Sequence, residues 1–131
     1  MDMKNAPLLE MKNIEKSFYG NQVLNDINIT LNEGDVLGLC GENGAGKSTL
    51  MKILFGMEEI AATGGYGGEI FINGNKVDFK SPFDALEAGI GMVHQEFSLI
   101  PGFSASENIL LNREPTKHNK GRYIPPLNIR L

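Results

Sequence analysis

A glycine-rich segment that ends in Lys-Ser-Thr constrains the fold of this chain more than any other feature. Residues 41–49 read Gly-Glu-Asn-Gly-Ala-Gly-Lys-Ser-Thr and fit the spacing G-x-x-x-x-G-K-[S/T], which is typical of loops that bind phosphate groups. The continuous apolar run 36–40 precedes the segment, as expected of a strand covered on both faces. A helix should begin near Lys47 and stop at Gly56. Strand, loop and helix are thus predicted in the order that such a loop requires.

The residue types in this segment fit the binding of a nucleoside triphosphate. Glycines let backbone N–H groups approach phosphate oxygens closely, and a helix N-terminus adds unpaired donors and a partial positive charge. Lys47 is predicted to reach the β- and γ-phosphates, and the hydroxyl of Ser48 to bind Mg²⁺. The residues of the loop predicted to bind the nucleotide are Gly41, Glu42, Asn43, Gly44, Ala45, Gly46, Lys47, Ser48 and Thr49.

The composition is that of a folded domain with an acidic balance. The 131 residues are 41% apolar, include 16 glycines and one cysteine, and carry a net charge of −4. Chains that stay disordered are poorer in apolar side chains and more highly charged. One cysteine excludes an internal disulfide and a site built from several thiolates. The acidic balance argues against a general nucleic-acid-binding protein, so no nucleic-acid partner is predicted.

Short strands and helices are predicted to alternate along the chain, which implies an α/β domain. Strands are expected around Leu9 and Met11, and at 27–31, 36–40, 70–72, 77–79 and 90–93, with turns at 32–34 and 73–75. The helix that begins near Lys47 is expected to place Leu50, Ile53 and Leu54 on its core face. A second helix is expected from Ser81-Pro82 to Gly89, and a third after the capping-box sequence 104–107.

The charge changes sign near the end of the chain. All 16 acidic side chains precede Lys117, whereas residues 117–131 hold four basic side chains and the pair Pro125-Pro126. No regular structure is predicted for this basic tail. Two domains follow from this division, residues 1–116 and the tail 117–131.

Three motifs in order resemble the nucleotide-binding cassette of ABC transporters. They are Lys16-Ser17-Phe18-Tyr19-Gly20, the phosphate-binding loop, and the stretch 90–96 that ends in Gln95-Glu96. The sequences 99–101 and 107–109 further resemble the first cassette of monosaccharide and nucleoside importers. The resemblance covers residues 8–116, which are thereby identified as the N-terminal part of an ABC ATP-binding domain. It implies a P-loop NTPase fold, with an incomplete RecA-like core and an antiparallel β subdomain.

The resemblance also implies roles for residues outside the loop. Phe18 matches the aromatic residue that stacks on adenine, with Tyr19 as the alternative ring. Gln95 matches the glutamine that touches Mg²⁺ and the attacking water, so that Lys47 and Gln95 are the implied catalytic residues, and Ser48 and Gln95 the metal ligands. The implied cofactors are ATP and Mg²⁺.

Family membership would place the chain in a larger assembly. It implies ATP binding, and in a complete cassette hydrolysis, that drives import of a sugar or related solute. The implied partners are transmembrane permease subunits, a second cassette and, indirectly, a solute-binding protein. The implied location is the cytoplasmic face of the plasma membrane, where the chain would be attached peripherally through the permease.

Several parts of the family pattern are absent from this sequence. There is no L-S-G-G-Q-like signature, no apolar run ending in Asp-Glu (the Walker B motif), and no later switch histidine. The chain is therefore expected to be a truncated or frame-shifted cassette with little or no hydrolytic activity. The glycine-rich stretch 64–68 resembles a loop insertion for which the sequence predicts no role.

Two other functions are compatible with a phosphate-binding loop. They are a stand-alone nucleotide-binding regulator and another P-loop enzyme, such as a GTPase or a nucleic-acid ATPase. Residues 75–78 fit the guanine-reading pattern N-K-x-D, but they are predicted to belong to a hairpin. His94 is predicted to lie at a strand end, and Cys40 to be a small core residue.

Overall fold

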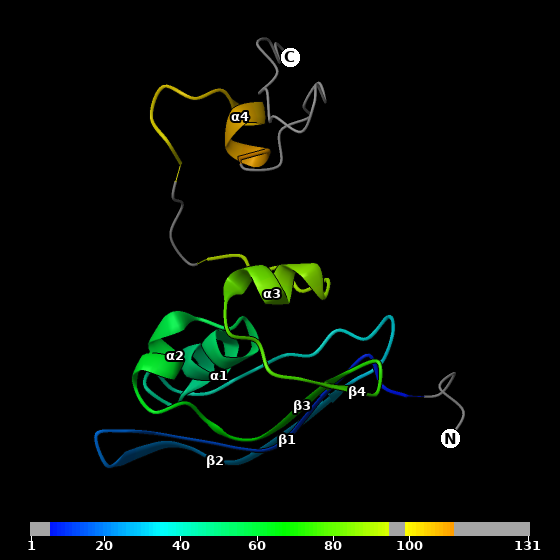
Figure 1. Ribbon diagram of the computed structural model, residues 1–131, viewed down its shortest axis with the longest axis vertical. Helices are drawn as coiled ribbons and strands as arrows, with labels where there is room; N and C mark the ends of the chain where they lie inside the picture. Colours follow the sequence, from blue (N-terminus) through cyan, green and yellow to red (C-terminus); the bar gives the residue numbers. More distant parts are fainter. Residues whose placement is uncertain (1–5, 95–98, 112–131) are drawn as a thin grey trace. The chain divides into compact units, whose positions relative to one another are not determined.

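A four-stranded sheet and short helices make up the described structure. The computed structural model in Figure 1 describes residues 6–94 and 99–111. The chain divides into two units, Met1–Met92 and Val93–Leu131, and each is treated by itself. The first unit contains β1 (Leu9–Phe18), β2 (Asn21–Leu31), α1 (Lys47–Leu54), α2 (Glu58–Ala62), β3 (Gly67–Ile72), β4 (Asn75–Val77) and α3 (Pro82–Glu87). The second contains α4 (Ala105–Ile109). The predicted α/β class with an antiparallel β part is confirmed.

The strands lie in the order β2-β1-β3-β4, and every neighbouring pair is antiparallel. A turn at Asn73 (φ 50°) and Gly74 (φ 78°) joins β3 to β4, because these residue types tolerate positive φ angles. The predicted hairpin is therefore confirmed. Its second strand is Asn75–Val77 and not 77–79, since Ile72 already pairs with Asn75 across the two-residue turn.

A bulge in β1 changes which side chains face the core. Met11 and Ile14 are both buried, although strict alternation would place them on opposite faces. Asn13, at φ 51°, is the extra residue between them. Its backbone N–H donates to Asn28 Oδ1 (2.9 Å), and its Nδ2 donates to Asp26 Oδ1 (2.7 Å). Hydrogen bonds from Asn13 and then Asn28 lower the pKa of Asp26 below its usual value.

Helices α1 and α2 cover one face of the sheet (Figure 1). The helix predicted at Lys47 is confirmed; it ends at Leu54, and the left-handed Gly56 (φ 68°) follows. Helix α2 was not predicted. The buried core side chains shared by the sheet and these helices are Met11, Ile14, Leu24, Leu50, Ile53, Ile60 and Ile70.

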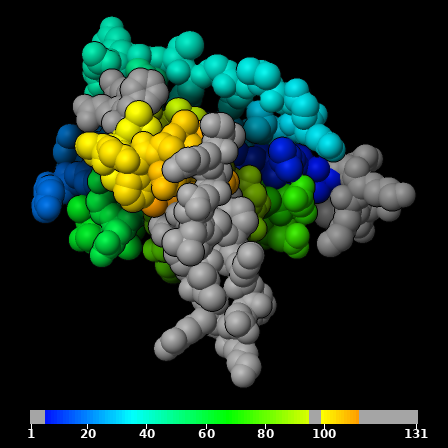
Figure 2. All heavy atoms as spheres, turned by 90° about the horizontal axis from the view of Figure 1, so that it is seen from above, coloured from blue at the N-terminus to red at the C-terminus, as the bar shows by residue number. Residues whose placement is uncertain are grey.

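Two predicted buried strands are wrong. Residues 36–40 and 90–93 form no strand, and Val36 and Val93 are 99% and 95% exposed. Cys40 is exposed, not a core residue, and His94 is exposed in a segment without regular structure. The cyan atoms of the segment between β2 and α1 lie on the surface in Figure 2. A strand covered on both faces needs hydrogen-bonded neighbours, and neither segment pairs with any part of 6–94 or 99–111.

The two predicted helix caps are confirmed. Ser81 accepts a hydrogen bond from the N–H of Asp84 (3.3 Å) at the start of α3, with Pro82 in the first position. In the second unit, Ser104 and Glu107 form the predicted capping box at the start of α4. None of the described helices is long and apolar enough to cross a membrane. Gln95 and the tail 117–131 lie outside the described residues.

Replacing Gly68 by alanine should destabilise the sheet. Gly68 has φ 93°, and a Cβ there would contact the backbone oxygen of Asn13 and lie 2.5 Å from that of Lys12, at the bulge. Gly64 is the matched control, because it has φ 95° and open space around it. Gly64→Ala should cost about 1–2 kcal/mol from the left-handed backbone alone, and Gly68→Ala clearly more. Urea unfolding followed by circular dichroism measures both; equal losses would contradict the packing argument.

Candidate phosphate-binding site

The loop 41–46 enters helix α1 through a glycine that packs directly on the sheet. Gly46 is buried and left-handed, with φ 94°. A Cβ at this position would lie 2.6 Å from Leu24 Cδ2 and 3.1 Å from the backbone oxygen of Val23, both on β2. Only glycine allows this approach. The N-terminus of α1 is therefore fixed against β2.

The side chain of Lys47 folds back over the loop. Its Nζ donates to the backbone oxygens of Gly41 and Glu42, the latter at 3.0 Å. The N–H of Ala45 also donates to the oxygen of Glu42 (3.1 Å), which closes a turn inside the loop. A Cβ on Gly41 would lie 3.2 Å from Ala45 Cβ and 3.8 Å from Lys47 Nζ. Loop and ammonium thus form one compact group at the start of the helix.

The remaining loop residues are accessible. Asn43, Gly44 and Ser48 are exposed and Thr49 is half-buried. Gly44 adopts φ 85°, a conformation that glycine tolerates. Ser48 lies in the first turn of α1, next to Lys47. Gln95, the other predicted metal ligand, is not among the described residues, so its predicted role stays a prediction.

The two candidate aromatic residues lie at the end of the β1–β2 hairpin. Tyr19 (φ 48°) and Gly20 (φ 84°) form its turn, and Tyr19 is 98% exposed. Phe18 is half-buried against the core and pairs with Asn21. Asn21 lies two residues along β2 from Val23, about 7 Å. The hairpin end is therefore close to the start of α1, and the choice between the two rings stays open.

Lys16 belongs to the motif 16–20, but its sequence position does not predict its environment. It is 2% exposed and lies on the core face of β1. Its Nζ donates to the backbone oxygens of Thr63 (2.9 Å) and Gly65 (2.6 Å), and lies 4.6 Å from the ring centroid of Phe18. Burial lowers the pKa of this ammonium. The bulge at Asn13 shifts the alternation of β1, so that counting from Met11 would place Lys16 on the outer face.

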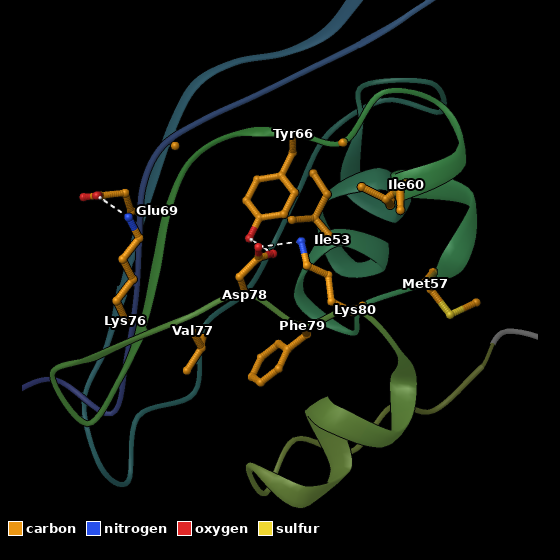
Figure 3. A pocket seen from close by; sticks show the side chains of 14 residues that line it. Ile53, Met57, Ile60, Tyr66, Glu69, Lys76, Val77, Asp78, Phe79 and Lys80 are labelled. Carbon is orange, nitrogen blue, oxygen red and sulfur yellow. Dashed lines mark hydrogen bonds and ion pairs between the residues drawn. The ribbon is translucent and has the colours of Figure 1, made fainter.

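A cavity of about 250 Å³ lies away from the phosphate-binding loop, between helices α1 and α2 and the β3–β4 hairpin (Figure 3). The hydroxyl of Tyr66 points at the carboxylate of Asp78 (3.5 Å), which also pairs with Lys80 (2.6 Å). None of the residues 41–49 lines it. Lys76 pairs with Glu69 across the hairpin (2.9 Å). Residues 75–77 thus form the second strand of the predicted hairpin, not its turn, and the stretch 75–78 is not grouped with the phosphate-binding loop.

Comparison with known proteins decides the family. The model of the ABC transporter family matches residues 24–126. The chain belongs to the ABC transporter family. This result agrees with the P-loop NTPase fold that the resemblance implied, and it excludes the alternative of an unrelated P-loop enzyme.

Named import proteins are among the similar sequences. The chain is 49% identical over 110 residues to a xylose import ATP-binding protein, XylG, of Histophilus somni, covering 84% of this chain and 21% of that protein. It is 48% identical over 114 residues to a glucose import ATP-binding protein, TsgD13, of Haloferax volcanii (86% and 20%). It is 45% identical over 113 residues to a guanosine import ATP-binding protein, NupO, of Bacillus subtilis (86% and 21%).

The chain therefore spans about a fifth of the length of the curated relatives that it matches. This coverage supports the prediction that the sequence represents part of a cassette. The names also confirm the predicted likeness to ATP-binding proteins of sugar and nucleoside import.

The pKa of Tyr66 should respond to Asp78. Burial first, and then the charge and hydrogen bond of Asp78, raise the pKa of Tyr66 to about 12, against a usual value near 10. The neutral phenol therefore stabilises the fold below about pH 10, and this contribution is lost as the pH rises through about 12. Asp78→Asn should lower the pKa of Tyr66, because the like charge is removed.

Tyrosinate absorbance during a pH titration measures this shift, and Tyr66→Phe identifies the step that belongs to Tyr66. Glu69→Gln is the matched control, since Glu69 lines the same cavity but pairs with Lys76. An unchanged titration in Asp78→Asn would contradict the assigned cause.

Proposed function

We propose that this chain is the ATP-binding part of a cassette that powers import of a sugar or related solute. In this proposal, the loop 41–49 binds the phosphates of ATP and Phe18 stacks on its adenine. Lys47 and Gln95 are the groups that contribute to hydrolysis in the complete cassette. The observation that carries the proposal is the fixed entry of the loop into α1 at Gly46, with the ammonium of Lys47 folded over the loop.

The contacts of Lys47 leave it able to bind a phosphate. An ammonium group has three donors, and two of them serve the backbone oxygens of Gly41 and Glu42. The third is available to a phosphate oxygen above the loop. The first N–H groups of α1 point toward the same end of the helix and favour an anion there. The site thus offers several donors and one cation to a polyphosphate.

A magnesium ion would be held by hard oxygen ligands. The exposed hydroxyl of Ser48, beside Lys47, supplies one such ligand, and the amide of Gln95 is the proposed second. When bound, Mg²⁺ neutralises charge on the phosphate oxygens. As a ligand, Ser48 would hold the ion near the N-terminus of α1.

The relatives support the assignment to import. Three of them are named as import ATP-binding proteins for xylose, glucose and guanosine. By analogy, we propose transmembrane permease subunits and a second cassette as partners, with a solute-binding protein acting indirectly. The proposed location is the cytoplasmic face of the membrane, with attachment through the permease.

Lys47→Ala should lower the affinity for ATP at least tenfold. A charge-assisted hydrogen bond contributes roughly 1.5–3 kcal/mol, and the variant removes the cation of the loop. Titration with a fluorescent ATP analogue measures the effect. Lys52→Ala is the matched control, because Lys52 lies on the same helix but pairs with Glu59 (2.7 Å). If both variants bind like the unsubstituted chain, the loop is not the nucleotide site.

Residues 1–131 should bind ATP with little or no turnover. The sequence has no Asp-Glu pair after an apolar run and no signature sequence, so no group is assigned to polarise the water or to complete the site. Phosphate release should stay at background with Mg²⁺ and should rise when the chain is extended through those motifs. Steady Mg²⁺-dependent turnover that Lys47→Ala abolishes would overturn this expectation and would point to another carboxylate, such as Glu96.

A further inference from the structure

Lys16 is a buried cation that has no role in the proposed function. Only 2% of the residue is exposed. Its Nζ donates to Thr63 Oγ1 (2.9 Å) and to the backbone oxygens of Thr63 (2.9 Å) and Gly65 (2.6 Å), and the backbone oxygen of Ile60 lies 3.4 Å away. These acceptors lie at and just beyond the C-terminus of α2, where carbonyl oxygens carry partial negative charge. The ammonium is therefore anchored in one place.

The same ammonium lies over the ring of Phe18, with 4.6 Å between Nζ and the ring centroid. A cation at this distance is attracted to the negative face of the ring, and more strongly when water is excluded. Phe18 is the last residue of β1, next to the turn at Tyr19 and Gly20. The ring is thus held from one face by a group that is itself anchored to the end of α2.

We propose that Lys16 is a positioning residue for base stacking: it fixes the ring of Phe18 and leaves another face of that ring to the base of the nucleotide. This inference rests on the proposed function, in which Phe18 contacts adenine. It also assigns a role to the start of the glycine-rich stretch 64–68, because the carbonyl of Gly65 makes the shortest of the anchoring hydrogen bonds.

The test separates contacts to the base from contacts to the phosphates. Affinities for ATP and for inorganic tripolyphosphate are measured on the full chain by displacement of a fluorescent ATP analogue. Lys16→Met should weaken ATP relative to tripolyphosphate, roughly two- to tenfold. Phe18→Ala should also lower the ratio of ATP affinity to tripolyphosphate affinity. The double variant should lose no more than Phe18→Ala alone, because Lys16 acts through that ring.

Lys12→Met is the matched control. Lys12 is on the same strand, and its Nζ lies 4.9 Å from the ring centroid of Phe71. It undergoes the same chemical change and loses a similar ring contact at a distance from the hairpin end. Its ratio of ATP to tripolyphosphate affinity should equal that of the unsubstituted chain.

A second measurement needs no substitution, in case Lys16→Met fails to fold. Binding of ATP should shift the NMR resonances of the Lys16 side chain, whereas tripolyphosphate should leave them unchanged. If Phe18→Ala alters the affinity ratio but Lys16→Met does not, or if ATP leaves the Lys16 resonances unchanged, the positioning role is overturned. If the unsubstituted chain binds no ATP, or Lys47→Ala and Phe18→Ala both bind it normally, the proposed function itself has failed.

Discussion

Helix α1 starts against strand β2 at a point where there is no room for a side chain. A Cβ at Gly46 would lie 2.6 Å from Leu24 Cδ2, and one turn later Leu50 enters the core that Leu24 also lines. The helix N-terminus is therefore set by packing on the sheet. Backbone donors at a helix N-terminus point along the helix axis. The contact of Gly46 with Leu24 therefore sets where these donors meet a phosphate.

The buried ammonium of Lys16 links the sheet, helix α2 and the hairpin end. An isolated buried charge is costly, and its cost is offset here by hydrogen bonds to the carbonyl oxygens of Thr63 and Gly65. Replacing the lysine with an apolar residue would remove these hydrogen bonds from the oxygens of Thr63 and Gly65. The ammonium of Lys16 thus has hydrogen-bond acceptors in the loop after α2, and the ring of Phe18 lies beside this ammonium.

Features that depend on neighbouring residues were predictable from the sequence, and features that depend on distant ones were not. The caps at Ser81 and Ser104 and the turn at Asn73-Gly74 are satisfied by atoms within a few residues. The bulge at Asn13 depends on a partner fifteen positions away, and the burial of Lys16 on acceptors more than forty away. For the site, the spacing of residues 41–49 predicted where the loop enters its helix, but not the contact with β2 or the role of Lys16.

The two sides of the phosphate-binding loop differ in burial, and this difference also depends on distant residues. On the helix side, Gly46 and Leu50 are buried. On the strand side, residues 32–45 are exposed throughout, and 36–40 pair with no described strand, although their apolar sequence suits one. The contacts of Lys47 with Gly41 and Glu42 hold the loop from its helix end. A polyphosphate that spans the loop would therefore contact a strand side that no described strand supports, and any freedom that this side loses on binding would reduce the affinity. Paired strands beside 36–40 would remove part of this cost, because the loop would then be held from both ends.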